Sequence, residues 1–208
     1  TGVCMGIFID GRLYRGATLA GGEIGNLAID FDGPLCDCGN KGCVESFATI
    51  GSILRYVRES LSAEGSSRSE GTHLSDSNDL TIDMIAAAAR RGDPVASAAL
   101  ERAGNAVGVG VANAVQILNP SLVVLCGRLA RAAGEYLIQA VRRTVEQRCV
   151  EMAKRGLEIR LSPPKKDISA VGCALLAAEA EAQRLVRLRL FSEPATEGES
   201  RSAVLQVR

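Results

Sequence analysis

The sequence lacks a surplus of charge of either sign. Its 24 lysine and arginine residues equal its 24 aspartate and glutamate residues. A protein that binds nucleic acid or an anionic membrane through its own surface usually carries clustered positive charge. The composition therefore predicts no nucleic-acid surface and no membrane patch in this chain.

Long apolar runs are also missing. No stretch approaches the roughly 20 consecutive apolar residues of a membrane span, and we expect no secretory leader. Hydrophobic residues make up 47% and charged residues 23% of the 208 residues, which is typical of a soluble globular protein with one good core. Because an initiating methionine is absent and the first residues resemble the interior of a strand, we expect a piece of a longer protein.

Histidine is nearly absent, whereas cysteine is not. The single histidine, His73, falls in an expected loop, where a solvated side chain is predicted. An odd number of cysteines, several in apolar segments, predicts reduced thiols in a cytoplasmic protein rather than a disulfide framework. The seven cysteines are Cys4, Cys36, Cys38, Cys43, Cys126, Cys149 and Cys173.

Short strands open the expected fold. An apolar run at 3–9 leads into Asp10-Gly11, a pair suited to the positive φ angles of a type I′ turn, and residues 12–15 complete a hairpin. A third strand is expected near 27–30. Together with later strands and helices, these predict an α/β fold with a mixed sheet covered by helices.

Helical spacing and capping residues dominate the rest of the chain. Helices are predicted at 46–62, 82–91, 94–118, about 130–149 and 168–190, with strands at 122–125 and 157–161. Residues 60–79 are rich in Ser, Gly, Asp and Glu and predict a mobile loop, and residues 191–208 predict a disordered tail. The expected lobe is residues 1–190.

Three of the cysteines, Cys36, Cys38 and Cys43, fall within eight residues among glycines and a proline that let the backbone bend. Thiolates select zinc, and a structural zinc takes four ligands in a tetrahedron. The alternative is three free thiols in a surface loop, but clustered exposed thiols are open to oxidation and bring no packing benefit. The cluster therefore favours a zinc site.

The surroundings of this cluster resemble the signature of the ROK family (repressors, open reading frames and sugar kinases). GGEIGN followed by GPLCDCGNKGCVES is similar to the family pattern A-G-E-x-G-H, then C-x-C-G-x-x-G-C-x-E, with ten residues from position 26 to Cys36. The segments GVCMGIFIDGRLYRG, ILNPSLVVLCG and SAVGCALLA resemble further family motifs. The resemblance spans the chain to about residue 190.

The resemblance implies the second lobe of an actin-like ATPase fold, of the hexokinase type and related to ribonuclease H. It implies that Glu23 and Glu45 hydrogen-bond sugar hydroxyls, and that the residue at position 26 touches the sugar and joins the three cysteines around zinc. By themselves, Glu23 would be an exposed loop acid and Glu45 a charge favoured by a helix N-terminus. The surrounding motif favours the sugar role.

Departures from the family pattern carry information too. Asn26 stands where the family has histidine, and an asparagine amide is a poor zinc ligand, so water, Asp37 or another nearby group would have to complete the site. Asn26 retains the ability to hydrogen-bond a sugar hydroxyl. Cys4 replaces a glycine that lets backbone approach a phosphate, and Cys126-Gly127-Arg128 replaces a glycine pair near the adenosine. These changes weaken the case for ATP.

The family's catalytic aspartate lies in the first lobe, and no matching stretch occurs here, so we predict no catalytic residue. We expect the sugar-sensing portion of a ROK-type transcriptional regulator, paired as a homodimer and contacting DNA only through an N-terminal region outside this chain. One alternative is the C-terminal half of an ATP- and magnesium-dependent, glucokinase-like sugar kinase. Another is a degenerate pseudokinase lobe that acts only as an interaction module.

Overall fold

The computed structural model describes residues 2–62, 71–75, 79–163 and 168–191. The chain forms two compact units, Thr1–Pro164 and Lys165–Arg208. Much of the predicted mobile loop, residues 63–70 and 76–78, lies outside the described residues, as does the predicted tail from residue 192. That the lobe extends to residue 190 stays a prediction.

The predicted hairpin at the start of the chain is confirmed. Strands β1 (Ile7–Ile9) and β2 (Arg12–Tyr14) pair in antiparallel fashion with Phe8 opposite Leu13. Asp10 and Gly11 have φ angles of 51° and 74°, as a type I′ turn requires.

The third strand predicted near 27–30 does not form. A 3₁₀ turn, η1 (Ile24–Asn26), precedes this segment, and only an isolated antiparallel bridge joins Ala28 to Cys43. The segment pairs with the returning arm of the cysteine loop, through the hydrogen bond from Ile29 N to Gly42 O (2.8 Å), and not with the hairpin. Within the described residues, the expected mixed sheet is therefore two separate two-stranded sheets, one antiparallel and one parallel.

The helix predicted over 46–62 is two helices, α1 (Val44–Ala48) and α2 (Ile50–Ser62). Thr49 separates them with an extended backbone, φ −71° and ψ 153°. Its hydroxyl accepts a hydrogen bond from Ser52 N (3.1 Å), as a helix N-cap does. The break follows from Thr49 because a residue that caps the second helix cannot continue the first.

Capping residues set the bounds of the next two helices as predicted. Thr81 caps α3 (Ile82–Arg90) and Asp93 caps α4 (Pro94–Leu118), with Pro94 in the first turn. The Asp93 side chain is buried, 4% exposed, and accepts bonds from Ala96 N (2.9 Å) and from the described part of the preceding loop.

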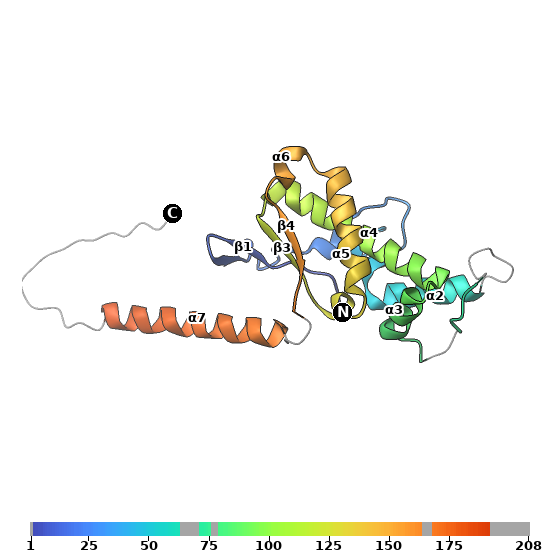
Figure 1. The fold of residues 1–208 in the computed structure, drawn as a ribbon. Coiled ribbons are helices and arrows are strands. Elements are labelled where there is room, and N and C mark those ends of the chain that lie inside the picture. Colours follow the sequence, from blue (N-terminus) through green and yellow to red (C-terminus); the bar gives the residue numbers. More distant parts are fainter. Residues whose placement is uncertain (1, 63–70, 76–78, 164–167, 192–208) are drawn as a thin grey trace, which may run out of the picture. The chain divides into compact units, whose positions relative to one another are not determined.

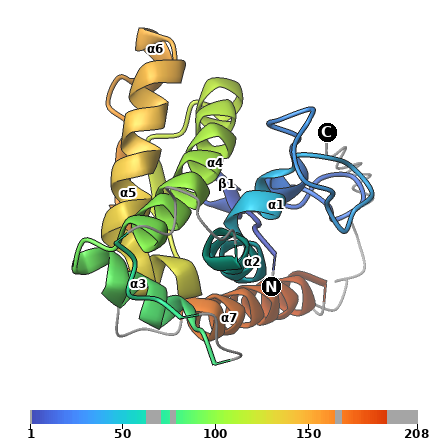
Figure 2. The same cartoon turned by 90° about the vertical axis from the view of Figure 1, so that its right-hand side faces the viewer.

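The second half of the larger unit is a parallel strand pair with helices on one face. Strands β3 (Leu122–Leu125) and β4 (Glu158–Leu161) pair in register, and the chain between them forms α5 (Arg128–Arg148) and the short α6 (Glu151–Lys154). Helices α4 and α5 lie side by side (Figures 1 and 2). Their buried residues share a core with the inward side chains of the strands: Val111, Val115, Leu125, Leu137, Val141 and Ile159.

Glycines on α4 allow this close helix pair. A methyl group at Gly104 would lie 2.7 Å from Ala140 Cβ, and one at Gly108 would lie 2.6 Å from Thr144 Oγ1. Contacts this short are not tolerated, so small residues are needed where the two backbones approach.

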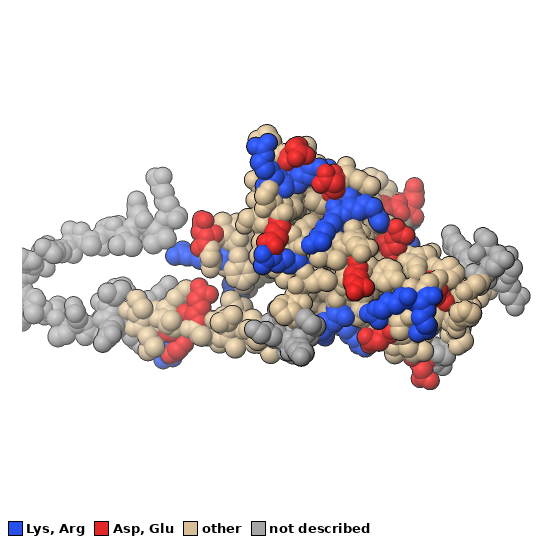
Figure 3. All heavy atoms as spheres, viewed as in Figure 1, with Lys and Arg blue, Asp and Glu red and all other residues tan. Residues whose placement is uncertain are grey.

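The smaller unit contributes α7 (Ile168–Phe191), the predicted final helix. None of the helices in the described ranges combines the length and apolarity needed to cross a membrane. Acidic and basic side chains are interspersed on the face drawn in Figure 3, rather than gathered by sign.

Candidate functional site

The cysteine segment folds as a small closed loop. A bridge joins Leu35 to Lys41, and Cys36 N donates to Asn40 O (2.8 Å) across the tip. Gly42 closes the base with a φ of 64°, and a methyl group there would overlap the carbonyl oxygen of Asp30. The glycine is therefore required for the loop to return beside the chain that enters it.

This loop brings the three cysteine sulfurs together. The Sγ atoms of Cys36, Cys38 and Cys43 all lie within 4.8 Å of one another, and those of Cys38 and Cys43 are 3.6 Å apart. Zinc–sulfur bonds of about 2.3 Å in a tetrahedron place sulfurs about 3.8 Å apart. The donor set thus fits three corners of a thiolate metal site after small adjustments. It is the cluster of metal-ligating side chains found among the described residues.

Asn26 lies beside this cluster, where the spacing in the sequence predicted a neighbour. Its Nδ2 is 4.0 Å from Cys36 Sγ, and its backbone oxygen is 3.6 Å from Cys43 Sγ. Asp37, the carboxylate considered as a substitute ligand, is exposed and does not join the group of converging ligand atoms. The fourth corner would therefore fall to Asn26 or to a water molecule.

The thiols of the cluster differ in acidity. Burial, followed by the neighbouring Cys38 and Cys36, raises the pKa of the fully buried Cys43 thiol to about 12. A backbone hydrogen bond from Asn40, together with Cys36, lowers the pKa of exposed Cys38. Three adjacent thiolates repel one another, so a bound cation would favour full deprotonation of the cluster.

Helix α1 follows the loop directly and carries Glu45 in its first turn. The Glu45 carboxylate is half-buried, and its Oε1 accepts a hydrogen bond from Val3 N (2.6 Å). A methyl group at Gly25 would lie 2.6 Å from Glu45 Cγ, which shows that the side chain packs against η1 next to Asn26. The structure therefore brings Glu45, Asn26 and the cysteines into one region.

Glu23 is placed differently. It directly precedes η1, its side chain is exposed, and that side chain makes no hydrogen bond or ion pair with any other described residue. Its carboxylate remains available to a ligand. Glu23 precedes η1 in the chain and Glu45 packs against η1, so η1 is the element that relates the two carboxylates.

Several contributors were not predicted from the sequence. The backbone of Val3 orients Glu45, and Met5 N donates to Gly22 O (2.8 Å), which fixes the chain before η1. A methyl group at Gly22, whose φ is 98°, would overlap Met5 O. The repeated glycines of this segment were a signal for such close approach, but they did not identify the partner. His73 is exposed, as predicted.

Comparison with known proteins identifies the family of most of this chain. The family model described as "ROK family" matches residues 1–180. A xylose repressor of Caldicellulosiruptor bescii is 34% identical over 174 residues, which are 83% of this chain and 42% of the repressor. A glucokinase of Thermotoga maritima is 30% identical over 189 residues, covering 86% of this chain and 56% of the kinase.

Solved structures of ROK family proteins are similar to this chain as well. A ROK family transcriptional regulator described as a homologue of the E. coli MLC protein superposes with a TM-score of 0.69 at 28% identity, covering 77% of this chain and 39% of that one. A ROK hexokinase from Thermus thermophilus gives a TM-score of 0.67 at 26% identity, covering 87% and 56%. The predicted α/β lobe of the actin-like ATPase fold is thereby confirmed, and the chain spans about half or less of the length of the relatives named here.

Proposed function

This chain belongs to the ROK family, and we propose that it is the sugar-binding portion of a ROK-type transcriptional regulator. The observation that carries the proposal is the anchoring of Glu45 beside η1 and the cysteine loop. A carboxylate held in this way, with a free carboxylate at Glu23 and the Asn26 amide nearby along the chain, offers the paired acceptors and donors that sugar hydroxyls need. The similarity to a xylose repressor supports the regulator over other ROK functions.

We also propose that Cys36, Cys38 and Cys43 hold a structural zinc ion. The convergence of their sulfurs supports this, and Asn26 or water would supply the fourth ligand. Zinc would hold the loop closed, so that α1 and Glu45 keep their place. Loss of the metal would loosen the sugar site without removing any residue that contacts the sugar.

The second candidate is the C-terminal half of a sugar kinase that uses ATP and magnesium. The 30% identity to a glucokinase favours it. Against it, Cys4 and Cys126 stand at positions where the family's nucleotide site uses glycine, and a side chain there crowds a phosphate or an adenosine. We therefore propose that the chain itself catalyses no phosphoryl transfer.

The remaining parts of the proposal concern partners and location. We place DNA contacts in sequence outside these residues, because the chain covers 42% of the xylose repressor and its own charges balance. All seven cysteines are free, which favours the cytoplasm. We also propose a homodimer, in which the second copy covers exposed apolar side chains such as Phe31 (92% exposed) or Met152 (80%).

Calorimetric titration with xylose, glucose and N-acetylglucosamine tests the sugar site. We expect saturable binding of at least one sugar, weakened about tenfold or more by Glu23→Gln, because a carboxylate is a stronger acceptor than an amide. Glu135→Gln, an exposed change on α5, is the matched control and should have no effect. Absence of binding to all three sugars, or equal behaviour of the two variants, would contradict the proposal.

A coupled assay with ATP and magnesium separates the two candidate functions. We expect no sugar phosphate to form, even when the protein is present in excess over the sugar and all of the sugar is bound. Formation of sugar phosphate in proportion to the amount of this chain would instead support the kinase.

A further inference from the structure

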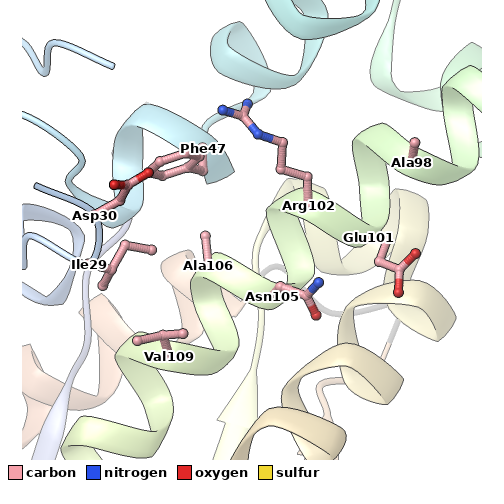
Figure 4. Close-up of a pocket in the computed structure, with 9 residues that line it drawn as sticks. All are labelled: Ile29, Asp30, Phe47, Ala98, Glu101, Arg102, Asn105, Ala106 and Val109. Atoms are coloured by element: carbon pink, nitrogen blue, oxygen red, sulfur yellow. The ribbon is translucent and has the colours of Figure 1, made fainter. Parts of the chain in front are cut away.

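A cleft lies between α4 and the base of the cysteine loop, and the residues assigned to sugar and metal do not line it. It encloses about 430 Å³. Figure 4 shows its walls: the Arg102 side chain extends from α4 toward Phe47, whereas the Asn105 side chain leaves α4 in another direction, on the side of Glu101. Ile29, Ala106 and Val109 give the cleft an apolar floor.

The guanidinium of Arg102 is unusually well oriented. Its Cζ lies 4.5 Å from the centre of the Phe47 ring and 4.9 Å from the centre of the Tyr56 ring. The contact with two aromatic rings restrains the guanidinium and uses none of its N–H donors in a conventional hydrogen bond. The half-buried Arg102 makes no hydrogen bond or ion pair with any other described residue. A partly desolvated, oriented guanidinium without a carboxylate is a natural partner for an anion.

The neighbouring charges on α4 do not oppose an anion. Glu101 is neutralised by Arg143, whose Nη2 lies 2.7 Å from Glu101 Oε1. The same Arg143 atom donates to Asn105 Oδ1 (3.1 Å), which leaves the amide hydrogens of Asn105 without an acceptor among the described residues. The α4 wall therefore presents the Arg102 guanidinium as a charged donor without a partner among the described residues.

The opposite wall has the reverse character. Asp30 lines the cleft, and one of its oxygens accepts a bond from Asp32 N (3.1 Å). Figure 4 shows the Phe47 ring between Asp30 and Arg102 in this view. An anionic group would consequently sit at the Arg102 end, with the apolar body of the ligand over the ring and the floor.

We propose that this cleft binds a small organic anion, a molecule that carries a carboxylate or a phosphate on an apolar body, through Arg102. The anion forms a forked pair of hydrogen bonds with the guanidinium, and the body displaces water from Ile29, Phe47 and Val109. None of the six residues assigned to sugar or metal lines the cleft, so this site is independent of the proposed function.

Nuclear magnetic resonance titration of the full 208-residue chain tests the proposal. The probes are phenyl phosphate and benzoate, which distinguish a phosphate from a carboxylate preference, and benzyl alcohol as an uncharged relative of both. We expect saturable shifts of the amide signals of Phe47, Arg102 and Asn105 with at least one anion. Benzyl alcohol should bind at least about tenfold more weakly, because charge-assisted hydrogen bonds are lost.

Three variants make the test specific. Arg102→Gln should weaken the preferred anion about tenfold or more, whereas Arg131→Gln, an exposed arginine on α5, should leave its affinity unchanged. Ala98→Phe keeps Arg102 but places a large side chain in the cleft from an exposed position on α4, and should also abolish binding. This variant keeps the test decisive even where Arg102→Gln lowers stability.

Three outcomes would overturn the proposal. One is equal binding of benzyl alcohol and the anions, and another is shifts that map outside the cleft. The third is no binding of either anion. If Arg102→Gln also disrupts self-association in that case, the cleft is an interface between two copies of the chain.

Discussion

The backbone N–H of Val3 donates a hydrogen bond to Oε1 of Glu45 over 2.6 Å, and the two residues are 42 positions apart. This bond holds the start of the chain against the first turn of α1. It also fixes the direction of the carboxylate that the sugar proposal relies on. A charged acceptor strengthens such a bond relative to a neutral one.

Replacing Glu45 by Gln should release the start of the chain. The amide oxygen of Gln is a weaker acceptor, so we expect a loss of about 1–2 kcal/mol in the free energy of unfolding and faster hydrogen exchange at the Val3 amide. Exchange followed by nuclear magnetic resonance measures the second effect directly. Glu23→Gln is the control, because its carboxylate makes no such bond. Unchanged exchange at Val3 would argue that the bond does not persist in solution.

Asp93 joins two parts of the fold through a buried carboxylate. Besides capping α4, it accepts bonds from Thr72 Oγ1 (2.8 Å) and His73 N (2.9 Å). Burial alone would raise its pKa, but the hydrogen bonds from Ala96, His73 and Thr72 outweigh burial and lower the pKa below its ordinary value. The charged form is therefore the one that the fold stabilises.

Asp93→Asn should lower stability at neutral pH by about 2 kcal/mol, because an amide nitrogen in place of Oδ2 cannot accept the bonds from Thr72 and His73. Because the folded pKa of Asp93 is lowered, its contribution is complete above the ordinary aspartate pKa of about 3.9 and is lost as pH falls through the folded value. Urea unfolding from pH 7 down to pH 3 should thus show the gap between wild type and variant closing at acid pH. Asp83→Asn, an exposed change in α3, is the control. A constant gap across this range would exclude the role given to the Asp93 charge.

Gly108→Ala should destabilise the α4–α5 pair. The added methyl group would meet Thr144 at 2.6 Å from Oγ1 and 2.7 Å from Cβ, so one helix must shift. Overpacking of this kind costs about 1–3 kcal/mol, which outweighs the gain of up to about 1 kcal/mol from the better helix propensity of alanine. Thermal unfolding measures the difference.

Gly51→Ala in α2 is the matched control for that substitution. Its methyl group would meet only Thr49 Oγ1, at 4.0 Å, and the position is exposed. We expect a neutral or slightly stabilising effect there. A similar loss of stability from both substitutions would contradict the packing argument.

Metal removal should change the number of reactive thiols. With zinc bound, we expect the exposed Cys4, Cys126 and Cys173 to react with a thiol reagent in the native protein. A strong chelator should add three thiols, those of the cysteine loop, because loss of the metal opens the loop and exposes the otherwise buried Cys43. Cys149 should stay unreactive in both states, because burial raises its pKa, Glu146 adds to the effect and Lys154 opposes it. Elemental analysis should find about one zinc per chain.

The zinc proposal fails under one clear result. Absence of metal from the purified protein, with no increase in reactive thiols after chelation, would show that the convergence of the sulfurs does not suffice without a histidine at position 26. Glu45 would then rely on Val3 alone for its orientation.

Elements that are stabilised by residues close together in the sequence could be predicted from the sequence. The Asp10-Gly11 turn, the starts of the helices at Ile82 and Pro94 and the strand segments at 122–125 and 157–161 formed as predicted, since each depends on residues within about one helical turn or on a short apolar run. The cysteine cluster was also predictable, because its three ligands lie within a few residues and only need a loop that closes.

Contacts between distant segments could not be read in this way. The segment at 27–30 had the composition of a strand. Its backbone pairs with the cysteine loop through an isolated bridge, so no strand formed. Neither the bond between Val3 and Glu45 nor the stacking of Arg102 on Phe47 leaves a periodic signal in the sequence.

The difference has a physical origin. A turn or a cap gains its energy from neighbours that the chain must bring together, whereas a long-range contact gains it only after the core has fixed the positions of both partners. The amino-acid order therefore determined the helices, the hairpin and the family to which the chain belongs. The packing of α1 and α4 against η1 and the cysteine loop determined where the carboxylates and Arg102 point, and so which ligands they can meet.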